Sequence, residues 1–132
     1  MSWPAELTSA KYISLETFRR DGTGVKTPVW FAELDGLLGV FTNGKSYKVK
    51  RLRRDSKVRV AACDLRGGVA EGAPWFDAEG TLVTDEALKE RVYRALKAKY
   101  GWQMGLITLS ATLSGRRKHW EVIAIERSSA EL

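Results

Sequence analysis

The chain has 132 residues, and 22 Lys and Arg against 16 Asp and Glu give it a formal net charge of +6 at pH 7. Its length fits one domain over 1–132, and 44% hydrophobic with 29% charged residues excludes a disordered chain. No apolar run approaches the roughly 20 residues that cross a bilayer, and the N-terminus lacks the pattern of a signal peptide. One cysteine excludes an internal disulfide or a Cys-rich zinc site, and one histidine argues against a histidine-based metal centre. We expect a reduced, cytoplasmic protein with an anionic partner.

The first third of the chain predicts three strands. Residues 11–19 alternate, which is typical of a half-buried strand whose buried face is formed by Ile13, Leu15 and Thr17. A turn at Asp21-Gly-Thr-Gly24 leads to a second strand over 25–34, and Asp35-Gly36 leads to a third over 37–42. Because both connections are tight, we expect an antiparallel meander, and a Rossmann fold is excluded.

The remaining elements follow in chain order. Ser46 is placed to cap a short helix over 47–54, and strands are expected over 57–63, over 75–83 with a bend at Gly80, and over 120–126. Residues 102–113 fit either a short helix or a strand, and we favour the helix. Six strands with helices between them predict a mainly β (α+β) protein, a small antiparallel barrel with helices packed outside.

The helix over 85–100 has the clearest pattern. Thr84-Asp85-Glu86 offers a cap and an acidic first turn, and Gly101 suits the position after the last turn. Its apolar stripe at helical spacing comprises Leu88, Val92, Ala95 and Leu96.

Several blocks, in this order and spacing, resemble a known family. They are Lys11-Tyr-Ile-Ser-Leu-Glu-Thr-Phe-Arg-Arg-Asp-Gly22, Thr27-Pro-Val-Trp-Phe31, Thr42-Asn43 and Lys48-Val-Lys-Arg-Leu-Arg-Arg-Asp55, followed by Pro74-Trp75, Lys99-Tyr-Gly-Trp102 and the Trp120 strand. Together they are similar to the pyridoxamine-phosphate-oxidase-like (pyridoxamine 5'-phosphate oxidase-like) FMN-binding split-barrel flavoproteins, in particular the branch of deazaflavin (F-420)-dependent oxidoreductases. The likeness covers nearly the whole chain, but Ser56-Lys57 stands where many relatives carry Pro-Arg.

The resemblance implies a six-stranded split barrel that forms a homodimer, with a flavin-type cofactor in each groove at the interface. It implies an oxidoreductase that transfers hydride between this cofactor and a small organic substrate. The deazaflavin coenzyme (F-420) is the first choice of cofactor and FMN the second, because the most similar branch uses the former.

The resemblance also implies the site residues. Lys48, beside Ser46, meets the cofactor phosphate, and Lys50 meets an anionic tail. The flavin ring lies along the second strand and near the third, at Val25, Thr27, Pro28, Val29 and Thr42. Trp75 reaches the cofactor from the other subunit.

Elementary chemistry agrees with this placement. A lysine at a helix start adds a point charge to the free N–H groups that favour phosphate there. Pro28 has no N–H, so it marks a strand edge, a bulge or a place where another molecule approaches the backbone. The sequence shows no Ser-His-Asp set, no metal-ligand spacing and no Gly-rich phosphate loop. We therefore predict no catalytic side chain, and the chemistry must come from a cofactor.

Other interpretations stay open. Six of the ten residues from Lys45 to Arg54 are basic, and this run also fits a solvated helix face or a contact with nucleic acid. A non-catalytic flavin-binding protein or a basic nucleic-acid-binding module is therefore the alternative function. Trp75 also fits a core position. We expect Trp102 to pack inside the fold, Cys63 to be a buried, inert thiol and His119 to face solvent.

Overall fold

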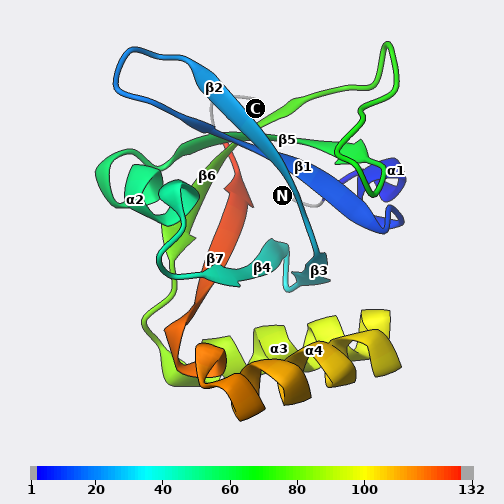
Figure 1. Ribbon diagram of the computed structural model, residues 1–132. Coiled ribbons are helices and arrows are strands. Elements are labelled where there is room, and N and C mark those ends of the chain that lie inside the picture. Colours follow the sequence, from blue (N-terminus) through cyan, green and yellow to red (C-terminus); the bar gives the residue numbers. More distant parts are fainter. Residues whose placement is uncertain (1–2, 129–132) are drawn as a thin grey trace.

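In the computed structural model, which describes residues 3–128, seven strands form one sheet with the order β2-β1-β5-β6-β7-β4-β3 and antiparallel pairing throughout (Figure 1). The strands are β1 (Tyr12–Phe18), β2 (Gly24–Val29), β3 (Phe31–Leu34), β4 (Leu37–Asn43), β5 (Lys57–Cys63), β6 (Phe76–Leu82) and β7 (Trp120–Arg127). The helices are α1 (Ala5–Thr8), α2 (Tyr47–Arg54), α3 (Glu86–Tyr100) and α4 (Trp102–Ser114), with a 3-10 turn η1 (Arg116–His119). None of the described helices is long and apolar enough to cross a membrane.

The prediction of six strands is wrong because the second predicted strand is two strands. Val29 ends β2 and pairs with Ile13 of β1, whereas Phe31 begins β3 and pairs with Val40 of β4. Both antiparallel pairings of the predicted meander are confirmed, but its middle strand is divided, so that β2 and β3 are the two outermost strands of the sheet. Only Trp30 separates them, and one residue spans under 4 Å. The sheet must therefore curl until its two edges meet at this point.

The side chain of Tyr100 holds the chain in place at this crossing. Its hydroxyl accepts a hydrogen bond from the backbone N–H of Phe31 (2.9 Å) and donates to the carbonyl of Lys11 (2.7 Å), with the Phe31 carbonyl at 3.0 Å. Its ring stacks on Trp30 at a centroid distance of 4.2 Å. Burial raises the pKa of Tyr100 to about 12, so the hydroxyl keeps its proton at neutral pH. The last residue of α3 thus ties the start of β3 to the residue that precedes β1.

Two apolar clusters lie on the two faces of the curled sheet. The barrel interior is filled from all seven strands and closed by Leu52 of α2; its largest members include Ile13, Leu15, Val60, Ile123 and Ile125. The second cluster lies between α3 and the β3-β4-β7 side of the sheet, where Val92 and Leu96 pack. Gly39 permits this approach, because a Cβ there would lie 2.7 Å from Val92 Cγ1.

The helix predictions are confirmed at α2, α3 and α4. The Asp85 carboxylate accepts from the backbone N–H of Ala87 and caps α3, and Gly101 after its last turn has a φ of 62°. α1 and η1 were not predicted. Both have four residues, too few for helical periodicity to be visible in the sequence.

The outer face of β1 is buried, although the alternating pattern predicts a half-exposed strand. Ser14 and Glu16 on this face are 1% and 6% exposed. The chain between β5 and β6 extends over the neighbouring strand, since a Cβ on Gly67 would lie 3.3 Å from Pro28 Cδ. Glu16 is also paired with Arg59 of β5 at 3.3 Å. The loop between β5 and β6 and the Glu16–Arg59 ion pair thus bury these polar residues. The alternation of polar and apolar residues along β1 cannot predict a distant loop or a cross-strand ion pair.

One side of α4 is apolar and exposed, contrary to the expectation that Trp102 packs inside the fold. Trp102 is 74% exposed. Leu106, Leu109 and Leu113 follow it at spacings of four, three and four residues, and each is more than half exposed. Met104 and Ala111 form the buried side of this helix. α4 therefore joins the fold by a narrow contact.

We predict that Tyr100→Phe destabilises the protein by about 1–3 kcal/mol, because it leaves the buried Phe31 N–H without an acceptor while preserving the ring. The measurement is the free energy of unfolding in urea. Tyr47→Phe is the matched control, since Tyr47 is exposed and its hydroxyl has no hydrogen-bond partner within the described residues. Equal stability of the two variants would show that the hydroxyl does not anchor the crossing.

Candidate functional site

The barrel interior brings together most of the residues predicted to contact a flavin ring. Burial alternates along β2, so Val25, Thr27 and Val29 share the inward face with their β1 partners, Leu15 among them. Thr42 lies on the same side of β4 as the core residues Leu38 and Val40. β2 is an edge strand. It pairs with β1 on one side and has no hydrogen-bonded strand on the other. These residues thus border the open side of the split barrel.

Pro28 lies on the opposite face of β2 and is exposed. Its partner across the ladder is Ser14, and the loop residue Gly67 lies close to its ring. A proline in an edge strand removes no required hydrogen bond, because one side of the strand is unpaired. The edge position of β2 is enough to explain why a proline is tolerated here. The predicted contact between Pro28 and the flavin ring remains a prediction.

Two buried hydroxyls on the predicted site have no hydrogen-bond partner. They are Thr27 Oγ1 on β2 and Ser46 Oγ at the start of α2. Ser46 occupies the N-cap position, but its side chain makes no capping hydrogen bond. The preceding Asn43 carboxamide instead accepts from the backbone N–H of Lys45. Ser14 Oγ, on the outer face of β1, is also buried and unpaired, so an unpaired hydroxyl does not by itself mark a site; at Thr27 and Ser46 it coincides with residues that the resemblance assigns to the cofactor, where a ligand could complete them.

Lys48 lies in the first turn of α2 and is half-buried. Burial lowers its pKa, and the nearby Arg51 lowers it further. No ion pair among residues 3–128 includes Lys48. A bound dianion would relieve both effects. The side chain therefore suits a phosphate, which the free N–H groups of the helix start also favour.

Hydrogen bonds tie α2 to the β1-β2 side of the barrel. Arg51 Nη1 donates to Thr17 Oγ1 at 3.3 Å, and Thr17 pairs with Val25 of β2. The helix that carries Ser46 and Lys48 is therefore fixed against the strand pair that carries the predicted ring contacts. The residues present thus fit a phosphate-bearing ring cofactor of the flavin type.

Lys50 does not share the surroundings of Lys48. It is exposed, and its Nζ lies 5.0 Å from the ring centroid of Tyr47. Both residues line a hollow outside α2, together with Arg19 and Arg20 of the β1–β2 turn. Sequence reasoning missed these two arginines, because only the fold places that turn beside α2.

Trp75 is half-buried and belongs to neither apolar cluster, so its interpretation as a core residue is wrong. It directly precedes β6. The Lys26 ammonium lies 4.8 Å and the Arg59 guanidinium 5.2 Å from its ring centroid, on the same outer face as Pro28. Both cations lie within cation–π range of the ring, and its predicted contact with the cofactor of a partner subunit remains a prediction.

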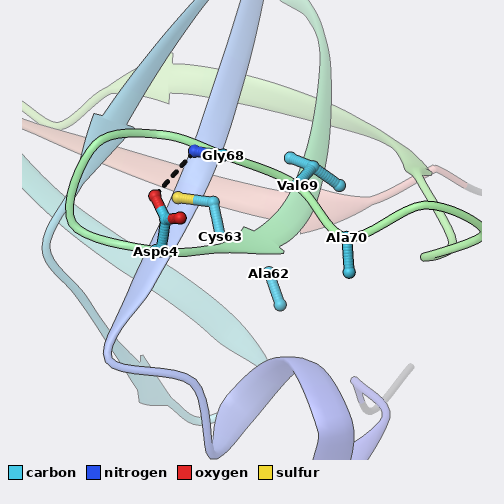
Figure 2. A pocket seen from close by; sticks show the side chains of 6 residues that line it. All are labelled: Ala62, Cys63, Asp64, Gly68, Val69 and Ala70. Carbon is cyan, nitrogen blue, oxygen red and sulfur yellow. Dashed lines mark hydrogen bonds between the residues drawn. The ribbon is translucent and has the colours of Figure 1, made fainter.

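A further hollow of about 490 Å³ surrounds Cys63 at the end of β5 (Figure 2). It is lined by Ala62, Cys63, Asp64, Gly68, Val69 and Ala70, and the Gly68 N–H donates to Asp64 Oδ1 at 2.8 Å. Cys63 is half-buried rather than fully buried. No basic side chain lines this hollow, so it offers nothing to a phosphate.

The described part of the chain contains no group of three or more His, Cys, Asp or Glu that would hold a metal ion. His119 is exposed, as expected.

The candidate site around Lys48, Ser46 and the inward face of β2 has the chemistry to bind an anion and a planar ring.

The fold is thus a seven-stranded split barrel whose candidate site includes a half-buried lysine and two unpaired hydroxyls. The family model described as pyridoxamine 5'-phosphate oxidase matches residues 3–128, and the chain belongs to this family. No curated protein matches the sequence.

Solved structures share the fold at low sequence identity. HutZ of Vibrio cholerae, described as a heme storage protein, is 13% identical with a TM-score of 0.67 over 90% of this chain and 82% of its own. A candidate pyridoxamine 5'-phosphate oxidase of Listeria innocua is 18% identical with a TM-score of 0.66, over 95% and 90% of the two chains. A FAD-binding protein of Mesorhizobium loti is 15% identical with a TM-score of 0.59, over 92% and 82%. These likenesses establish the split-barrel fold.

We predict that Cys63 reacts slowly with iodoacetamide. Burial, followed by the nearby Asp64 carboxylate, raises the pKa of this thiol from 9.0 to about 11. At pH 8 the thiolate fraction is then about 100-fold lower than for a thiol with the ordinary value, and the thiolate is the reactive form. The rate in the folded protein is compared with the rate in urea. Equal rates would contradict the inferred shift.

Proposed function

We propose that this protein is an oxidoreductase that binds a flavin-type coenzyme at the open side of the barrel. The unpaired hydroxyls of Ser46 and Thr27 and the half-buried Lys48, which follows Ser46 at the start of α2, carry the proposal, because they offer hydrogen bonds and charge that the protein itself does not use. Family membership supports it, and the Mesorhizobium loti protein with this fold is described as FAD-binding. The deazaflavin coenzyme (F-420) is our first choice and FMN the second, as the sequence resemblance implies.

Such a coenzyme, when bound, supplies the acceptor or donor of a hydride. The side chains of this protein bind and orient it. Lys48 and the start of α2 hold its phosphate, Ser46 and Thr27 complete hydrogen bonds, and the apolar side chains of Val25 and Val29 exclude water from one side of the ring. The second reactant is a small organic molecule, and no protein side chain is required to take part covalently.

The proposal includes a homodimer, with Trp75 contacting the coenzyme of the partner subunit. Its half-buried ring, with the cations of Lys26 and Arg59 at 4.8 and 5.2 Å from its centroid on the outer face of the sheet, supports this role. An aromatic ring flanked by positive charge suits a surface that meets an anionic, planar coenzyme.

The sharpest test titrates the protein with F-420 and with FMN and follows the quenching of tryptophan fluorescence. We expect one of them to bind with a Kd below about 100 μM, which corresponds to about 5.5 kcal/mol. If neither coenzyme binds, the proposed coenzyme site is contradicted, and so is the proposed oxidoreductase activity that depends on it. Binding without turnover of any acceptor would instead indicate the alternative, a non-catalytic flavin-binding protein.

We predict that Lys48→Ala weakens coenzyme binding roughly 10- to 150-fold, because a charge-assisted contact to phosphate contributes about 1.5–3 kcal/mol. Arg53→Ala is the matched control. It removes the same charge from an exposed position of the same helix, and no described ion pair includes Arg53. Equal, modest losses in both variants would mean that the helix acts only as a diffuse positive field.

We predict that Thr27→Val has opposite effects on stability and binding. The substitution keeps the side-chain volume and removes a buried hydroxyl that has no partner, so the free protein should gain about 0.5–2 kcal/mol of unfolding free energy. Coenzyme binding should fall by about 10-fold because one hydrogen bond is lost. Calorimetry measures both quantities. A stabilised variant with unchanged affinity would exclude Thr27 from the coenzyme site.

A further inference from the structure

A second basic site lies on the exposed side of α2. A hollow of about 340 Å³ between this helix and the β1–β2 turn is lined by Arg19, Arg20, Tyr47, Lys50, Arg51 and Arg54. Five of these six residues are cationic, and none is acidic. Neither Ser46 nor Lys48 lines it, although Lys50, which the resemblance assigns to the anionic tail of the coenzyme, does. Its volume is that of a small-molecule site.

Two hydrogen bonds fix guanidinium groups at this hollow. Arg54 Nη2 donates to the carbonyl of Phe18 at 2.6 Å, and Arg51 Nη1 donates to Thr17 Oγ1 at 3.3 Å. Both acceptors lie at the end of β1, directly before Arg19. The helix and the turn are thus held together, and a ligand would find two of the cations already in place. Prior ordering of this kind lowers the entropic cost of binding.

The positive charges at the hollow are not neutralised by the protein. No ion pair within the described residues includes any of the five cations. The acids nearest in sequence are engaged elsewhere: Asp21 is fully exposed and accepts from the Thr23 N–H, and Asp55 accepts from the Lys57 N–H. Attraction to Arg19 is only a minor cause of the lowered pKa of Asp21. Like charges converge here, and a polyanion would relieve their repulsion.

The ordinary explanation covers only part of this arrangement. Basic residues in the last turn complement the helix dipole, which accounts for Arg51, Arg53 and Arg54. It does not account for Arg19 and Arg20, which come from a different element and converge on the same hollow.

Tyr47 adds an aromatic surface. It is 71% exposed, and Lys50 Nζ and Arg51 Cζ lie 5.0 and 5.9 Å from its ring centroid. An exposed ring among cations is suited to stacking on a nucleobase, whereas a guanidinium fork matches phosphate oxygens. The spacing of Tyr47, Lys50, Arg51 and Arg54 places all four on one side of the helix.

We propose that this hollow binds a nucleoside triphosphate or diphosphate, with the phosphate chain on the arginines and the base against Tyr47. The proposal does not depend on the coenzyme, which is placed at the barrel opening.

The experiment titrates ATP and inorganic triphosphate into the protein by calorimetry at about 150 mM salt, where exposed, well-separated charges are largely screened. We expect Arg20→Ala to weaken binding of both ligands by about 10-fold or more. Tyr47→Ala should weaken the binding of ATP by about 10-fold and leave the binding of inorganic triphosphate unchanged, because only ATP has a base that stacks on the ring. Lys118→Ala, which removes an exposed cation of η1, is the matched control and should change neither.

Four results would overturn the proposal. The first is no ATP binding at about 1 mM, equivalent to about 4.1 kcal/mol. The second is a loss of ATP affinity in Lys118→Ala equal to that in Arg20→Ala, which would mean that ATP responds only to the overall positive charge of the protein. The third is tighter binding of a single-stranded oligonucleotide that displaces ATP, which would assign the hollow to nucleic acid.

The fourth concerns independence from the coenzyme. Lys48→Ala should retain ATP binding even where it weakens the coenzyme. If Lys48→Ala abolishes ATP binding and the coenzyme displaces ATP, the hollow belongs to the coenzyme site. Far-UV circular dichroism identifies a misfolded variant, and Arg19→Ala then provides a second test on the same turn.

Discussion

The architecture depends on the single residue between two strands that lie at opposite edges of the sheet. β2 pairs only with β1 and β3 only with β4, yet Trp30 alone joins them. A flat sheet of seven strands at about 4.8 Å spacing would separate these edges far beyond the reach of one residue. Curling is therefore imposed by the covalent chain, and Tyr100 supplies the hydrogen bonds that an ordinary strand pairing would supply there.

The two edges of the sheet are joined only at Trp30, so the barrel is incompletely closed. The candidate site lies where it stays open. The two edges meet at Trp30 but are not paired along their length, so the inward residues of β2 border an opening. Thr27 and Ser46 keep buried hydroxyls without a partner, and Lys48 is half-buried without an ion pair among the described residues; in the proposed function these groups meet the coenzyme.

Local signals in the sequence predict the elements well and their partners poorly. Asp35-Gly36 predicts a tight hairpin, and both residues have positive φ, 51° and 83°. α3 begins and ends where its cap and its glycine predict, since these depend on the nearest few residues. The only local signal near the break at Trp30 is Pro28, and it does not indicate that the segments on either side pair with different strands. The burial of Glu16 depends on Arg59, 43 residues away, and on a loop that no periodicity describes. Similarly, Ser46 is a cap by position only.

The apolar side of α4 affects how unfolding of this protein can be followed. Dyes such as ANS fluoresce on exposed hydrophobic surface and usually report a loosened, molten state. Here the native protein already presents Trp102, Leu106, Leu109 and Leu113 to solvent. The dye signal of the folded state would start high, and a fall in dye fluorescence on heating would be consistent with loss of an ordered binding surface. Trp30, stacked on Tyr100 at the crossing, is the better reporter, because its environment exists only while the two edges of the sheet are joined.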